Sequence, residues 1–209
     1  IDILKRAWTT GRYSADGPIY RIPDLAVYPP AVQTPHPPFY MGGTSAGAIK
    51  RAACKGDKWL SLPMEALPEV TKLTAQYKAE CEKAGVQPRI CLMREAWVAN
   101  TRSAIEEDWL PRALSFHRYY WETGTKGDEH DPVLQRVGAG ENVGLEEFAT
   151  DRAFAGTPKF VIDEISRWHE AIGFDEVLLI FATGREATTE AKLKGAVETF
   201  AKEVMPAFA

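Results

Sequence analysis

The sequence lacks the excess of basic residues that nucleic-acid-binding proteins carry, and it also lacks any long apolar run. Its 209 residues include 25 Lys and Arg against 29 Asp and Glu, which gives a formal net charge of −4. A surface of that charge would displace few counterions from a phosphate backbone, so we expect no nucleic-acid partner. No stretch has the length and apolar character of a membrane-spanning helix, so we expect no membrane partner.

Cysteine and histidine are scarce, and neither residue type is arranged as a metal-binding motif. The three cysteines form no Cys-x-x-Cys pair, and the four histidines show no ligand spacing with them. An odd number of cysteines indicates free, buried thiols in a reducing compartment, so we expect a cytoplasmic protein without a metal site. His36 and His130 have no Ser, Cys or Asp partner at motif spacing, which argues against a hydrolase triad. His117 and His169 lie beside apolar helix stripes and are expected to pack there.

The remaining composition is that of an ordinary globular protein, with 45% apolar and 26% charged residues. The length fits a single domain, residues 1–209, with enough chain to bury a sizeable core. The chain opens at Ile1 without an initiator Met, and residues 1–8 read as an amphipathic helix with no residue to cap its start. We therefore expect the chain to be a fragment of a longer protein.

Strand and helix patterns alternate along most of the chain. Residues 9–38 are rich in Pro and Gly and predict an irregular connection. Four short apolar runs then predict strands, and each is followed by a helical pattern. The predicted strands are 39–41, 58–62, 90–99 and 176–182. Because these runs are apolar on both faces, they predict a parallel sheet covered by helices, either half of a (β/α)8 barrel or a small doubly wound sheet.

Residues 123–156 interrupt this alternation with glycines and acidic residues, and they predict a polar loop or lid. The cluster of Asp128, Glu129 and Asp131 is expected to be solvated. Order resumes at Thr157 and Pro158, which suit the N-cap and the first position of a helix.

Five motifs in this order resemble the bacterial luciferase-like, flavin-dependent monooxygenase superfamily, and together they cover nearly the whole chain. Each motif alone is weak, and the resemblance rests on their order. The motifs are 37–45, 52–60, 94–101, 156–165 with 173–175, and 200–206.

The resemblance implies a TIM barrel of which this chain supplies strands five to eight. A whole barrel needs about 250 residues, so the N-terminal half is expected to be missing. The implied activity is that of an oxidoreductase in which reduced FMN activates oxygen for attack on a small organic substrate. The alternative is hydride transfer by a 5-deazaflavin coenzyme. The resemblance assigns the usual catalytic groups mostly to the absent strands, so no catalytic residue is named.

The strongest candidate site is the segment formed by Gly42, Gly43, Thr44 and Ser45, at the carboxyl end of a predicted strand. Glycines allow close approach of the backbone, and a helix that begins at Thr44 or Ser45 would attract an anion. A tight strand–helix turn with a hydroxyl cap would explain the same residues without a ligand. The resemblance implies that this turn holds the flavin phosphate.

Two charged residues, Arg94 and Glu95, lie inside an apolar strand, where alternation sends one toward the barrel axis and the other toward the helices. A buried charge is costly unless it is paired. The two therefore predict either a contact with flavin or substrate or a structural ion pair. Trp59, in the second strand, is expected to belong to the core.

A function of another class is also consistent with a half-barrel. Open sheet edges and an exposed apolar inner face would require a partner, either a second copy of the chain or a complementing N-terminal half. Such a module would be non-catalytic. A small flavodoxin-like binding domain is a third reading, and the order of the motifs argues against it.

Overall fold

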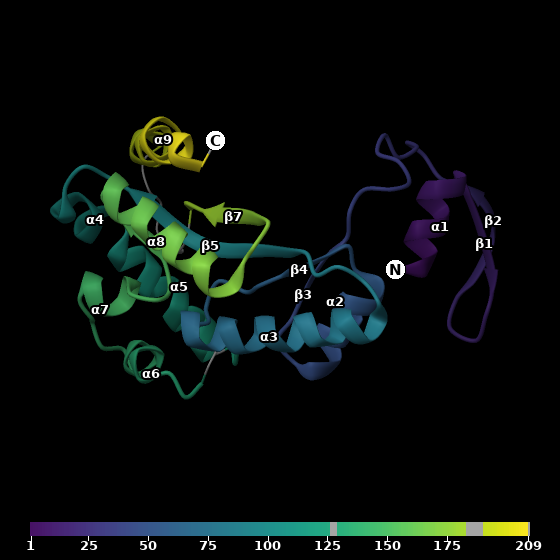
Figure 1. Ribbon diagram of the computed structural model, residues 1–209, viewed down its shortest axis with the longest axis horizontal. Helices are drawn as coiled ribbons and strands as arrows, with labels where there is room; N and C mark the ends of the chain where they lie inside the picture. The colour runs from purple at the N-terminus through teal and green to yellow at the C-terminus, as the bar shows by residue number, and fades with distance from the viewer. Residues whose placement is uncertain (126–128, 183–189, 209) are drawn as a thin grey trace.

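The computed structural model describes residues 1–125, 129–182 and 190–208, and its centre is a sheet of parallel strands (Figure 1). Both β4 and β7 pair with β5 at Cys91, so they lie on its opposite edges. β3 continues the sheet beyond β4, and β6 pairs further along β5, from Ala96 to Val98. The strands are β3 (Tyr40–Gly42), β4 (Lys58–Leu60), β5 (Ile90–Val98), β6 (Phe154–Gly156) and β7 (Glu176–Ile180).

Three helices cover one face of the sheet, as the alternating pattern predicts: α2 (Ala46–Lys55), α3 (Leu67–Ala84) and α8 (Pro158–Ile172). Their boundaries follow the predicted caps, because the Ser45 hydroxyl accepts from the backbone N–H of Ala48 and Gly85 ends α3 at a φ of 68°. Side chains from these helices and from the sheet form the larger core cluster. Its fully buried members include Ile49, Trp59, Val70, Leu92, Val161 and Trp168.

A second core cluster surrounds Trp97, on the other side of β5. It is built by α4 (Arg102–Asp108), α5 (Leu110–Glu122), α6 (Pro132–Gly138), α7 (Leu145–Ala149) and α9 (Glu190–Thr199). The helical pattern that follows the run 90–99 forms two helices rather than one, because α4, capped by Thr101, and α5 meet at Trp109. Pro111 explains the break, because it has no N–H to donate to the preceding turn.

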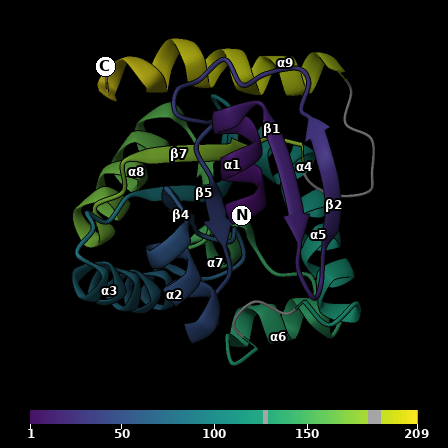
Figure 2. The same cartoon turned by 90° about the vertical axis from the view of Figure 1, so that its right-hand side faces the viewer.

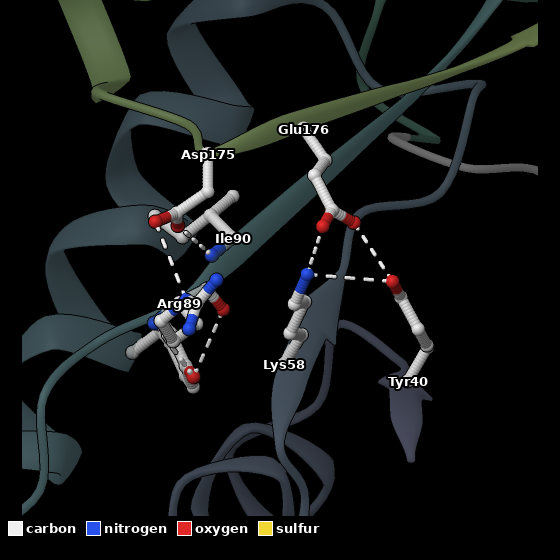
Figure 3. A network of polar contacts seen from close by, with 7 residues as sticks. Tyr40, Lys58, Arg89, Ile90, Asp175 and Glu176 are labelled. Carbon is white, nitrogen blue, oxygen red and sulfur yellow. Dashed lines mark hydrogen bonds and ion pairs between the residues drawn. The ribbon is translucent and has the colours of Figure 1, made fainter. Parts of the chain in front are cut away.

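The sheet is concave on the face opposite α2, α3 and α8, which we call the inner face. On this face the hydroxyl of Tyr40, in β3, donates to Glu176, in β7, at 2.8 Å (Figure 3). These strands are three positions apart in the sheet, which in a flat sheet would separate them by about 14 Å. Curvature toward the inner face therefore brings the two side chains together, as in the wall of a barrel.

The prediction of an irregular connection over 9–38 is wrong for its first half. α1 (Asp2–Thr10) is followed by an antiparallel hairpin of β1 (Arg12–Asp16) and β2 (Arg21–Ala26). Proline usually indicates irregular structure, but Pro23 lies on an edge strand, where one missing N–H donor is tolerated. Figures 1 and 2 show α1 and this hairpin beyond the amino ends of the strands, at the opposite end of the molecule from α4. α1 contacts the body by stacking Trp8 on Phe39, with ring centroids 5.2 Å apart.

The prediction of a polar loop over 123–156 also needs correction. This segment contains α6, α7 and β6, and the carboxylate of Asp131 is buried rather than solvated. Asp131 caps α6 by accepting from Val133 N and Leu134 N, and it forms a buried ion pair with Arg152. Asp128 lies outside the described residues. A role for this segment as a lid stays a prediction.

The chain continues past α9 into a π-helical turn (Phe200–Val204) and a 3-10 turn (Met205–Phe208). Within the described ranges, every helix is too short or too polar to cross a bilayer.

Candidate functional site

The glycine turn, Gly42–Gly43–Thr44–Ser45, joins the carboxyl end of β3 to the first turn of α2. Gly43 has a φ of 120°, a backbone conformation that residues with a side chain rarely adopt. A Cβ at this position would lie 2.6 Å from the Cβ of Ala48. The geometry of the turn therefore requires glycine at position 43 whether or not a ligand binds.

Gly42 differs from Gly43, because nothing in the fold requires glycine there. A Cβ on Gly42 would meet the carbonyl oxygen of Leu60 at 3.7 Å and Cδ2 of Leu62 at 3.8 Å, which are ordinary contacts. Gly42 is exposed and lies two residues after Tyr40 in β3, so the two positions face the same side of the sheet. The missing side chain of Gly42 therefore leaves space on the inner face. A close approach by a ligand would account for that space.

The first turn of α2 offers an anion two kinds of donor. Backbone N–H groups at the start of a helix have no intrahelical partners and carry the positive end of the helix dipole. The Ser45 hydroxyl accepts from Ala48 N at 3.3 Å, so its own proton can point outward. Thr44 adds a second hydroxyl beside it. These groups could hold a phosphate without moving the backbone.

Trp59 fixes the turn from the neighbouring strand. Its indole Nε1 donates to the carbonyl oxygen of Gly43 at 3.1 Å, and its ring packs on Tyr77 with centroids 5.6 Å apart. Trp59 is fully buried, which confirms the prediction that it belongs to the core. The same packing raises the pKa of Tyr77 to about 12, chiefly because burial disfavours the phenolate.

Arg94 and Glu95 point to opposite sides of β5, as alternation predicts, and they do not pair with each other. Arg94 lies over the ring of Trp168, in α8, at 4.2 Å. Glu95 faces Nε2 of His117, in α5, at 3.4 Å, and both side chains are almost completely buried. The close polar neighbour of Glu95 is therefore His117 and not Arg94.

His169 and His36 each contact an aromatic ring. His169 lies edge-on against Phe174, with centroids 5.0 Å apart, as expected for a packing residue. His36 lies edge-on against Phe39, and its Nδ1 is 3.9 Å from Asp57. No three metal-ligating side chains come together in the part of the chain that the structure describes. Cys81 and Cys91 are buried as predicted, but Cys54 is exposed.

Sequence reasoning missed a polar network at the amino ends of the strands (Figure 3). Lys58 forms an ion pair with Glu176, and its Nζ lies 3.4 Å from the Tyr40 hydroxyl. The pKa of Glu176 is lowered, first by the hydrogen bond from Lys58 and then by that from Tyr40. Nearby, Asp175 accepts from Ile90 N at 2.7 Å. Alternation within β3 and β4 could not reveal this network, because Glu176 is distant in the sequence.

The network lies at the opposite end of the strands from the glycine turn. In TIM barrels the amino ends serve stability, whereas ligands bind at the carboxyl ends. A cavity of about 610 Å³ also lies away from the turn, between α8, the start of β7 and the C-terminal segment. The carboxyl end of β3 therefore remains the better candidate for a ligand site.

Comparison with solved structures shows which known folds the chain resembles. The chain superimposes on the coenzyme F420-dependent tetrahydromethanopterin reductase of Methanopyrus kandleri with a TM-score of 0.72 at 17% identity, covering 100% of this chain and 61% of that one. For the oxygenating constituent of 3,6-diketocamphane monooxygenase of Pseudomonas putida, solved with FMN, the TM-score is 0.68 at 18% identity, with coverage of 99% and 61%. A monooxygenase of Streptomyces bottropensis gives 0.67 at 20% identity, with 98% and 58%.

These likenesses show a fold of the TIM-barrel family, and the chain spans about three fifths of the length of each of these proteins. The family model for luciferase-like monooxygenases matches residues 1–176. That match covers most of the chain, including the glycine turn, β5 and the start of β7. The chain belongs to the luciferase-like monooxygenase family.

Proposed function

We propose that this chain is the flavin-binding part of a luciferase-like oxidoreductase and that its glycine turn holds the phosphate of reduced FMN. The observation that carries the proposal is the difference between the two glycines. Gly43 is explained by the turn itself, whereas the open space at Gly42 is explained by a group that must come close to the backbone. The free N–H groups at the start of α2 make that group an anion.

The residues present fit a phosphate. Gly43 and the first residues of α2 would supply backbone N–H donors, and the hydroxyls of Thr44 and Ser45 would supply two more. Trp59 keeps the Gly43 carbonyl turned toward β4, which leaves the N–H groups of the turn available to the ligand. Leu62 lies beside Gly42 and would form an apolar wall for the part of the cofactor next to the phosphate.

A bound flavin would supply the redox chemistry, either by activating oxygen when FMN is reduced or by transferring hydride when the cofactor is a 5-deazaflavin. The chain's own residues bind and orient the phosphate end of either cofactor. Family relatives are consistent with both choices, since one was solved with FMN and another depends on coenzyme F420. We propose FMN as the cofactor and a small organic molecule as the substrate.

Fluorescence titration with FMN tests the proposal, with Gly42→Ala and Gly195→Ala as a matched pair. The Gly42→Ala change fills the space at the turn without backbone strain, so FMN affinity should fall by at least about tenfold while the melting temperature stays within about 2 °C. Gly195→Ala lies in α9, away from the turn, and its new Cβ would meet no described atom within 4 Å, so it should leave FMN affinity unchanged. The proposal fails if the wild-type chain binds neither FMN nor a deazaflavin, even with a complementing N-terminal half present.

A specific observation favours a second function, that of a module which pairs with another chain. Tyr40 and Leu178, on or beside the inner face, are 40% and 42% exposed. Among the described strands, β3 and β7 each pair along one edge alone. Apolar surface and open edges of this kind favour a second copy or a complementing N-terminal half. Size-exclusion chromatography tests this, and a stable monomer near 23 kDa would count against it.

A further inference from the structure

Arg94 is the feature of β5 that neither the fold nor the proposed cofactor site yet explains. It lies in the middle of a central strand, on the face covered by helices, and none of its surface is exposed. Its guanidinium carbon lies over the ring of Trp168, 4.2 Å from the ring centroid, within the larger core cluster. A buried cation is costly, so its hydrogen bonds identify its role.

All the hydrogen bonds of Arg94 come from one nitrogen and reach backbone carbonyls. Nη1 donates to the carbonyl oxygen of Leu62 at 2.5 Å and to that of Met93 at 2.7 Å. Nε and Nη2 have no hydrogen-bond partner among the described residues. Burial lowers the pKa of Arg94 to about 9, which leaves it charged at neutral pH. The orientation of the side chain is thus set by the Leu62 and Met93 carbonyls and by Trp168.

Leu62 belongs to the connection between β4 and α3, residues 61–66, which leaves the sheet at the carboxyl ends of the strands. The start of this connection is bonded to β5, because Ser61 N donates to Cys91 O at 3.1 Å and Met93 N donates to the Ser61 hydroxyl at 3.0 Å. Arg94 follows Met93 in β5, and its side chain bonds the carbonyl of Leu62, which follows Ser61 in the connection. The donors of Met93 and Arg94 therefore fix Ser61 and Leu62 in turn.

The side chain of Leu62 faces the glycine turn. Its Cδ2 lies 3.8 Å from the Cβ position of Gly42, and on the other side Trp59 bonds the Gly43 carbonyl. A short path therefore runs from the Arg94 guanidinium through the Leu62 backbone and side chain to the turn. The charge of Arg94 matters on this path because a charged donor forms a stronger hydrogen bond to the Leu62 carbonyl than a neutral donor would.

We propose that Arg94 is a positioning residue for the glycine turn: by holding the Leu62 carbonyl it keeps the Leu62 side chain against Gly42 and fixes the shape of the turn. That this positioning serves cofactor binding rests on the proposed function. The positioning of the turn by Arg94 does not depend on that function. The hydrogen bonds of the Arg94 side chain reach Leu62 and Met93 and not the turn, so Arg94 acts on the turn through Leu62.

Hydrogen exchange of the backbone amides, measured without cofactor, tests the positioning on Arg94→Met, Arg94→Lys and Leu62→Ala. Arg94→Met keeps the apolar stem but removes the donors, so the amides of Ala48 and Ile49, whose hydrogen bonds to Ser45 join the turn to α2, should exchange about tenfold faster or more. Arg94→Lys retains a charged donor and should restore most of the protection. Leu62→Ala removes the wall and leaves the carbonyl bond, so it should loosen the same amides.

Arg112→Met is the matched control, because Arg112 is also a buried arginine, lies 4.8 Å over the ring of Trp97 and donates to the carbonyl of Asp108. It belongs to the other core cluster and should leave the amides of Ala48 and Ile49 protected. The inference is overturned if Arg94→Met loosens all elements equally, if Arg112→Met loosens the turn as much, or if Leu62→Ala leaves the turn unchanged. Should Arg94→Met not fold, Arg94→Lys and Leu62→Ala still decide.

FMN titration of the same variants separates this inference from the proposed function. Arg94→Met should bind FMN about tenfold more weakly, and Arg94→Lys should bind nearly as the wild type does. If the wild type binds no flavin, the proposed function fails while the exchange result still stands or falls on its own. If flavin binds equally to all variants although the turn is loosened, positioning does not serve the cofactor.

Discussion

Replacement of Gly43 by Ala gives the most quantitative test of the turn's geometry. A residue with a side chain at a φ of 120° incurs strain of about 1–3 kcal/mol. The new Cβ would also lie 2.6 Å from the Cβ of Ala48, which requires the first turn of α2 to move by about 1 Å to reach an ordinary contact. Together these effects should lower the free energy of unfolding by about 2–4 kcal/mol.

Thermal unfolding followed by circular dichroism measures this loss. For a chain of this length, about 2–4 kcal/mol corresponds to a fall in melting temperature of about 4–16 °C. Gly47→Ala is the matched control, since Gly47 lies inside α2 and its new Cβ would meet Nη1 of Arg51 at 3.5 Å. That change should be neutral or stabilise the chain by up to about 1 kcal/mol. If Gly43→Ala is as stable as Gly47→Ala, the strain argument is wrong.

Two further predictions concern the charged pairs. Hydrogen bonds from Lys58 and Tyr40 lower the pKa of Glu176 below its ordinary value of 4.5, so its contribution to stability is present above that pH and is lost as the pH falls through the lowered value. Glu176→Gln should therefore flatten the fall of stability in urea melts between about pH 5 and pH 3, by less than about 1 kcal/mol because the carboxylate is partly exposed. An unchanged acid limb would contradict this. Asp131→Asn keeps an acceptor for the cap of α6 but leaves Arg152 as an unpaired buried charge, so it should lower the free energy of unfolding by about 3 kcal/mol. A loss under about 1 kcal/mol in urea titration would show that the pair does not hold this segment together.

Local signals were strong enough to predict most of the sheet and its covering helices. Leu67–Ala84 has apolar residues at helical spacing and Gly85 after it, and Ile90–Val98 is an apolar run that only Arg94 and Glu95 interrupt, so the sequence indicates both elements. The hairpin over 12–26 was missed because glycine and proline mark loops and edge strands alike. Asp131 was misjudged because its partner, Arg152, lies 21 residues away.

The sequence predicts only part of the candidate site. The order of glycines and hydroxyl residues predicts a turn at the start of a helix, and the structure has that turn. The sequence could not distinguish Gly42 from Gly43, because the need for glycine at 43 depends on a backbone angle and on the neighbouring Ala48. Likewise, alternation predicts that Arg94 and Glu95 face opposite sides of the strand but not which of them faces the helices. The bond from Arg94 to Leu62 depends on how β4 and β5 are aligned.

The central claim is that the glycine turn binds the phosphate of the cofactor, and comparison of FMN with riboflavin, which lacks the phosphate, tests it most directly. Amide chemical shifts of the ¹⁵N-labelled chain would be followed while each ligand is added. We expect FMN to shift the amides of residues 43–46 and to bind at least about tenfold more tightly than riboflavin, because riboflavin leaves the donors of the turn unused. Equal affinities for the two ligands, or shifts that leave residues 43–46 unmoved, would contradict the account.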